Sequence, residues 1–236
     1  MGKRIKGYIV CTSRLYRLIL FLLLPVVVIG QQVGLSVMYR YLEGWERDPN
    51  EIVRIANFSM CAMAMIMLAV EIVIDSLAFG GIAAKGGKSP EYLKSSKRGK
   101  QLTRVALQTN LFRQFLENGV VLFLGRASWS IAAGSSVELF GIRNLIFSLA
   151  VLFCQYFAMV IALMVTRRYN SFQVNLTIAS IAYFISVLLF FLCGRYGIVM
   201  FVSAVLLSVA AGIFSQYVTM KRVEESYYDQ KPKTGC

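Results

Sequence analysis

Four charged side chains lie inside apolar stretches of the sequence, where they could bind or move ions. Glu71 and Asp75 are four residues apart, and Arg113 and Glu117 have the same spacing. Residues four apart share one face of a helix. A charge near the bilayer centre is costly, so such groups usually face partners or water. The pattern indicates either a polar translocation path or proton-coupled site, or structural ion pairs with Asp75 and Arg113 close enough to helix ends to reach water.

Other site chemistries find little support in the sequence. The chain has no histidine, so a Ser/His/Asp or Cys/His arrangement for catalysis is excluded. Its five cysteines are scattered without a CxxC pair, and zinc ligation is not expected. The stretch GGIAAKGGKS is similar to a phosphate-binding loop, but Ile82 occupies the position where that motif needs its first glycine. We therefore predict no enzyme activity, metal or cofactor for this chain.

The composition is typical of a membrane protein. Of the 236 residues, 57% are hydrophobic and 16% charged, whereas soluble domains carry about 25% charged residues. The apolar residues fall in blocks of about 20, the length that crosses a bilayer as a helix. The net charge of +13 is concentrated at the ends of these blocks, which favours membrane orientation and contact with lipid over nucleic-acid binding. The predicted fold is an all-α integral membrane protein.

We predict six spans in one transmembrane domain over residues 1–220, followed by a short cytoplasmic tail at 221–236. The spans are expected at about 18–38, 55–82, 105–125, 142–165, 172–193 and 198–220. The third is the most polar, and two arrangements remain open for it. It either spans with its polar stripe facing protein or lies partly in the interface before inserting. The small residues of 126–141 predict a short outer connection.

The distribution of basic residues predicts the orientation. With six spans, 18 Lys and Arg fall on the side of the termini and six on the other side, with Arg113 inside a span. Positive charge in short loops marks the cytoplasmic side, so both termini are expected to be cytoplasmic.

The loop at 85–104 carries seven of these basic residues against one acid. It can serve as a lipid anchor, as a topology signal or as a docking element. In the last case, Ser89 and Pro90 would start a helix that presents Tyr92 and Leu93 to a cytoplasmic protein.

This arrangement resembles the membrane-spanning permease subunit of an ABC transporter, in the type-2 exporter family. Such permeases have six spans, with an acid late in the second span and a basic connection that holds a coupling helix before the third. Here EIVIDSLAFGGIAAKGGKSPEYLKSSKRGKQLTRVAL occupies that place, with Glu71 or Asp75 as the acid. Where the family commonly has an LPVSR-like motif, this chain has YLKSSKRGK. The resemblance implies a coupling loop for the ATPase made of Ser89, Pro90, Glu91, Tyr92, Leu93 and Lys94.

The resemblance also implies a mechanism, partners and a location. A separate ATP-binding-cassette subunit would bind ATP and drive alternating access, and a second permease copy, identical or not, would complete the path. The substrate would be amphiphilic, such as a peptide, lipid or drug. Methionines of the second span and the polar face of the third would line the path. The location would be the bacterial cytoplasmic membrane. Two alternatives remain: a stand-alone ion-coupled carrier or channel using Glu71, Asp75 and Glu117, and a membrane scaffold or immunity-type protein without transport.

Overall fold

The computed structural model describes residues 15, 18–43, 49–79, 82, 97–133, 139–169 and 171–228. Within these ranges the chain is helical. A short π-helical turn, η1 (Ile19–Leu23), leads without a break into α3, the first α-helix among the described residues. The six α-helices are α3 (Leu24–Glu43), α4 (Pro49–Phe79), α6 (Lys97–Ala133), α7 (Ile142–Thr166), α8 (Phe172–Tyr196) and α9 (Ile198–Tyr228).

Four of the described helices are long and apolar enough to cross a membrane. These stretches are Asn50–Phe79, Ile142–Thr166, Gln173–Tyr196 and Ile198–Glu225. The prediction of a helical membrane protein is therefore confirmed in its general form. The count of six spans, which also requires α3 and α6 to cross, stays a prediction.

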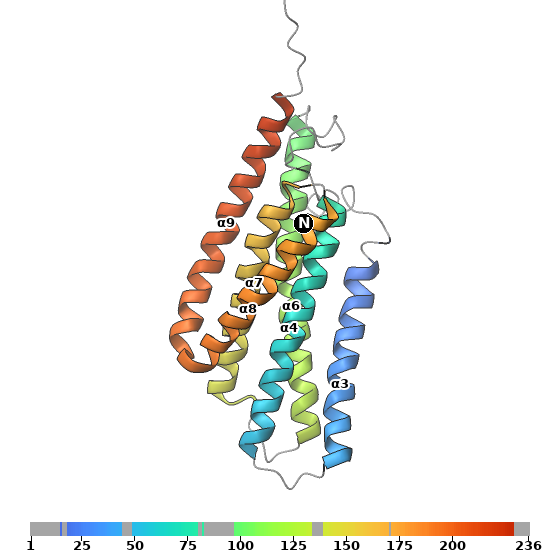
Figure 1. Ribbon diagram of the computed structural model, residues 1–236, viewed down its shortest axis with the longest axis vertical. Helices are drawn as coiled ribbons and strands as arrows, with labels where there is room; N and C mark the ends of the chain where they lie inside the picture. The colour runs from blue at the N-terminus through green and yellow to red at the C-terminus, as the bar shows by residue number, and fades with distance from the viewer. Residues whose placement is uncertain are drawn as a thin grey trace, which may run out of the picture.

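The helices stand side by side and alternate in direction (Figure 1). The start of α3 and the end of α9 lie at the same end of the bundle, together with the end of α4 and the start of α6. We call this the basic end, because eight basic residues occupy the helix termini there. They are Lys97, Arg98, Lys100, Arg104, Arg167, Arg168, Lys221 and Arg222.

Helix α7 lies at the centre of the packing, in contact with α4, α6, α8 and α9. Its buried face consists mainly of small and aliphatic side chains, which allow close helix approach. The methionines Met60, Met63 and Met67 of α4 are also buried, in a core cluster shared with α3, α6, α7, α8 and α9. Met63 also lines a cavity of about 260 Å³ between α3 and α4, and the expectation that methionines of this span line a path stays a prediction.

Helix α6 is longer than the predicted third span and includes both of its flanks. Its first two turns, 97–104, come from the basic loop, and its last turns come from the predicted outer connection. Trp129 explains the extension, because it is buried and its Nε1 donates to Oε1 of Gln32 on α3 at 3.2 Å. The connection from α6 to α7 therefore begins after Ala133.

The polar stripe of α6 faces protein. Leu107, Leu111, Gln114 and Asn118 are buried, as their shared helical face requires, whereas Phe112 on another face is 63% exposed. Of the two arrangements predicted for this segment, the packing favours the one in which its polar residues face other helices. At the other end of the chain, α9 continues to Tyr228 and so takes in the first half of the predicted tail.

Candidate functional site: a buried charge network

A buried ion pair with two hydrogen bonds joins α4 to α6. Arg113 donates from Nη1 to Oε1 of Glu71 at 2.8 Å and from Nη2 to Oε2 of the same residue at 2.6 Å. Glu71 is fully buried and Arg113 is 6% exposed. The two parallel hydrogen bonds match the planar fork of a guanidinium to a carboxylate, the geometry that stabilises a buried ion pair best.

Further groups on α6 complete the surroundings of this pair. Arg113 also donates to Glu117, one turn along its own helix. Gln114 donates from Nε2 to Oε2 of Glu71 at 3.1 Å. Arg113 thus donates hydrogen bonds to two carboxylates, and the side-chain amide of Gln114 donates a further one to Glu71.

A second ion pair ties α4 to the end of α7. Arg167 donates from Nε to Oδ2 of Asp75 and from Nη2 to Oδ1, both at 3.2 Å. Both residues are fully buried. The guanidinium also lies over the ring of Phe79, with its Cζ 5.8 Å from the ring centre. An arginine that follows the last helical residue of α7 is thereby held inside the bundle rather than in water.

Asn110 of α6 links the two ion pairs. Its Nδ2 donates to Oδ1 of Asp75 at 2.6 Å, and its Oδ1 accepts from Nε and Nη2 of Arg113 at 3.4 Å. The result is one continuous charge network across three helices. Its members are Glu71, Asp75, Asn110, Arg113, Gln114, Glu117 and Arg167.

The network lies toward the basic end, because Asp75 is in the last turns of α4 and Arg167 follows the end of α7. It contains three carboxylates against two guanidinium groups. Oε1 of Glu117 and Nη1 of Arg167 are buried without a hydrogen-bond partner among the described residues. Such an arrangement can hold helices in one relative position or exchange a proton.

A second polar cluster lies nearer the opposite end. Arg126 of α6 donates to Oδ1 of Asn57 on α4 at 2.6 Å and to Oγ of Ser148 on α7 at 2.8 Å. These contacts are between an arginine and neutral groups only. They satisfy a buried cation and fix the spacing of the same three helices.

The structure brings together all four charges that the spacing singled out: Glu71, Asp75, Arg113 and Glu117. Asp75 and Arg113 do not reach water within this fold, since both are buried. Arg167 was missed, because its place in RRY after an apolar block predicts an exposed turn. Three carboxylates against one arginine among the four predicted charges were the available signal that another cation was needed. The predicted coupling residues, Ser89, Pro90, Glu91, Tyr92, Leu93 and Lys94, lie outside the described residues.

Within the described part of the chain, no cluster of three or more histidine, cysteine or acidic side chains is arranged to hold a metal ion. Comparisons with protein-family models, with curated proteins and with solved structures find no match to this chain.

Proposed function

We propose that the chain is the membrane permease subunit of a transporter that is powered by a separate ATP-binding-cassette ATPase. One observation supports this most directly. Helix α6 begins in the basic segment and runs without interruption to Arg113 in the charge network. A force applied to the basic segment would therefore reach the network through a single helix.

The length of α6 suits the transmission of such a force. Sixteen residues separate Lys97 from Arg113, which is about 24 Å along a helix at 1.5 Å per residue. The whole of α6 has 37 residues and is about 55 Å long, which exceeds the hydrocarbon thickness of a bilayer. Its first turns would then project beyond the membrane, where a soluble ATPase can contact them.

The charge network supplies two alternative states for the moving helix. Arg113 is shared between Glu71 of α4 and Glu117 of its own helix, so a shift of α6 can release the first contact while the second is kept. Packed helix interfaces switch between discrete arrangements rather than deform continuously. In this proposal the inward state has Arg113 paired with Glu71, and ATP binding by the partner favours the other state.

The proposal keeps the partners and location implied by the resemblance. A second permease copy, identical or not, would complete a path for an amphiphilic substrate in the bacterial cytoplasmic membrane. Both termini and the basic end would face the cytoplasm. In keeping with this, α8 and α9 present many exposed apolar side chains, such as Phe184, Leu188, Leu206 and Phe214, that lipid or a second copy would cover.

A stand-alone ion-coupled carrier is the second candidate. It is favoured by the excess of one carboxylate in the network and by the unpartnered Oε1 of Glu117. A proton on that oxygen would supply the missing positive charge. This candidate predicts transport by the purified chain in response to a proton gradient alone, and loss of that transport in Glu117→Gln.

The deciding experiment purifies the tagged chain from its native membranes and measures ATP hydrolysis in the eluate. We expect an associated ATPase, and we expect the combined substitutions Glu91→Ala, Tyr92→Ala and Leu93→Ala to remove it. Arg143→Ala, an exposed position at the opposite end, is the matched control and should retain the ATPase. Retention by the triple variant would refute docking at the basic loop. A chain without ATPase that transports in vesicles would be a carrier, and one that does neither would be a scaffold.

A further inference from the structure

A hollow at the basic end separates α6 from α9. The cavity has a volume of about 400 Å³, and Arg104 of α6 and Tyr217, Met220, Lys221 and Glu224 of α9 contribute to its wall. A second cavity of about 590 Å³ follows between the same two helices, farther from the basic end. Gln108 and Gln216 line both cavities, so the two form one continuous groove. Both volumes fall in the range of ligand pockets.

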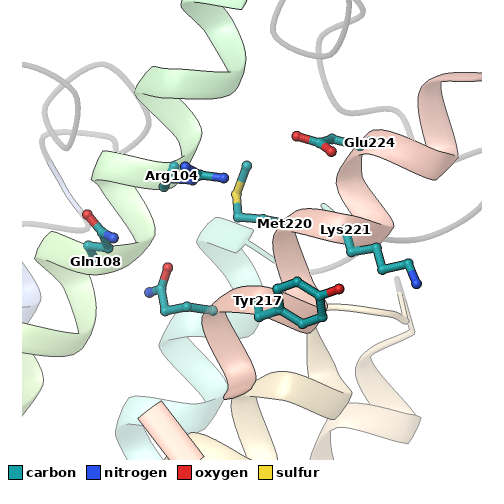
Figure 2. A pocket seen from close by; sticks show the side chains of 7 residues that line it. Arg104, Gln108, Tyr217, Met220, Lys221 and Glu224 are labelled. Atoms are coloured by element: carbon teal, nitrogen blue, oxygen red, sulfur yellow. The ribbon is translucent and has the colours of Figure 1, made fainter. Parts of the chain in front are cut away.

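The outer cavity carries charges of both signs on opposite walls. Arg104 and Glu224 point into the same space from α6 and α9 (Figure 2), whereas Lys221 extends away from Arg104. Arg104 and Glu224 form no ion pair with each other among the described residues. A ligand that places an anion beside Arg104 and a cation beside Glu224 would complement this cavity.

The second cavity is mainly apolar. Its walls include Leu111, Phe112 and Phe115 of α6, Phe153 of α7 and Ile213 of α9. Phe112 and Ile213 are 63% and 69% exposed, so the groove opens at the outer surface of the bundle, while Leu111 in its floor is buried. Arg104 to Phe115 covers about 16 Å along α6, close to half of the hydrocarbon thickness. An acyl chain that lies along this groove would stay within one leaflet.

Gln216 lies where the polar and apolar parts meet. Its side-chain Nε2 and Oε1 are both shielded from solvent, and neither has a hydrogen-bond partner among the described residues. Buried amides are nearly always paired, so a polar group bound in the groove beside Gln216 would complete its hydrogen bonding. At this depth the ester carbonyls of a glycerophospholipid would accept from Nε2.

We propose that the groove between α6 and α9 binds an aminophospholipid of the phosphatidylethanolamine type. The phosphate lies against Arg104, the primary ammonium against Glu224, the ester region against Gln216 and one acyl chain along the apolar cavity. The continuous apolar floor distinguishes such a lipid from free phosphoethanolamine. This inference concerns a lipid site and does not rest on the transport function proposed above.

The charges argue for this head group over its common alternatives. Phosphatidylglycerol is anionic and has no ammonium group to pair with Glu224. Phosphatidylcholine carries a positive charge but no N–H group that can donate to a carboxylate. A primary ammonium donates up to three hydrogen bonds, and hydrogen bonds between ionised groups are about twice as strong as neutral ones.

The test is native mass spectrometry of the purified full-length chain, titrated separately with didecanoyl phosphatidylethanolamine, phosphatidylcholine and phosphatidylglycerol. We expect tightest binding of the first. Arg104→Gln should lower the binding affinity for all three lipids about tenfold, because one hydrogen bond to a charged group is lost. Glu224→Gln should reduce the preference for phosphatidylethanolamine over phosphatidylcholine to near parity.

The groove itself can be blocked without disturbing the core. Nothing lies within 4 Å of a Cβ added at Gly212, which lines the apolar cavity, and the same holds for Gly194 on α8, outside the groove. Gly212→Leu should weaken binding of every lipid at least tenfold, and Gly194→Leu should leave binding unchanged. Unaltered lipid binding by Gly212→Leu would refute the proposed lipid site, and equal affinity for the three lipids would refute it as well. Binding of dihexanoyl and didecanoyl lipids with the same affinity would show a head-group site only and would also overturn the proposal.

Discussion

Arg113 of α6 and Glu71 of α4 face each other as two planar groups joined by hydrogen bonds of 2.8 and 2.6 Å, with both side chains buried. Their roles in the network are unequal. Arg113 is the only cation in contact with Glu71 and Glu117 among the described residues, whereas Glu71 is one of two acids in contact with Arg113. Losing the arginine therefore leaves the buried Glu71 and the partly buried Glu117 without a cation, and losing Glu71 leaves no charge unpaired.

The first prediction follows from this asymmetry. Arg113→Leu should lower the free energy of unfolding by about 3–5 kcal/mol, the range for removing one partner of a buried ion pair. Glu71→Gln should cost only about 1–3 kcal/mol, because Arg113 keeps Glu117 and Asn110 as partners. Equilibrium unfolding of the detergent-solubilised chain measures both values.

The matched control for this prediction is Arg98→Leu. Arg98 is exposed in the first turn of α6, and surface changes of this kind usually alter the free energy of unfolding by less than about 0.5 kcal/mol. If Glu71→Gln destabilises the chain as much as Arg113→Leu does, the asymmetric sharing of Arg113 is wrong.

The second prediction concerns the pair that joins α4 to the end of α7. Asp75 and Arg167 should show a coupling energy of about 0.5–3 kcal/mol in a double-mutant cycle made with Asp75→Asn and Arg167→Gln. The neighbouring Arg168 supplies the control. A cycle of Asp75→Asn with Arg168→Gln should give a coupling close to zero, and coupling of equal size in the two cycles would contradict the assignment of Arg167 as the partner.

The third prediction compares two glycines on α6. A Cβ added at Gly125 would lie 2.7 Å from Cε of Met63, whereas one added at Gly119 would meet Cδ2 of Leu152 at an ordinary 3.6 Å. Because Cε is the flexible end of the Met63 side chain and can shift, Gly125→Ala should destabilise the chain by about 1 kcal/mol, the low end of the range for overpacking. Gly119→Ala should stabilise it by up to about 1 kcal/mol, because alanine favours the helix.

A shorter side chain on α4 provides a further check on this packing. Combining Gly125→Ala with Met63→Ala removes the atom that clashes, so the effects of the two substitutions should not add. Thermal unfolding in detergent measures the stability of Gly119→Ala, of Gly125→Ala, of Met63→Ala and of the double variant. Additive losses would show that Met63 and Gly125 are not in contact.

Sequence patterns predict the features of this chain that depend on local periodicity. The length of the apolar blocks gives the helical membrane class, and the spacing of four residues places Glu71 with Asp75 and Arg113 with Glu117 on shared faces. The buried side of α6 follows from the same rule, since Gln114 and Asn118 lie one turn apart.

Local sequence patterns do not predict contacts between residues that are far apart in the sequence. Asp75 and Arg167 are 92 positions apart, and only the approach of α4 and α7 brings them together. An arginine after an apolar block resembles a solvated turn, and nothing local shows that it folds back. The length of α6 was underestimated for a similar reason. Its last turns are held by the contact of Trp129 with Gln32, 97 positions away.

The last prediction tests the packing of α7 against α8 through their thiols. Cys154 and Cys193 are both buried, and their Sγ atoms lie 3.6 Å apart. A disulfide needs about 2.05 Å, so small rotations of the two side chains would bring the sulfurs into bonding distance. We expect copper–phenanthroline to form this bridge within one chain in a Cys11→Ser, Cys236→Ser background, detected by mass spectrometry of the digested protein. Cys61→Ser should still give the bridge and Cys154→Ser should abolish it. A disulfide that instead joins Cys61 to Cys154 or to Cys193 would contradict the arrangement of α4 and α8 around α7.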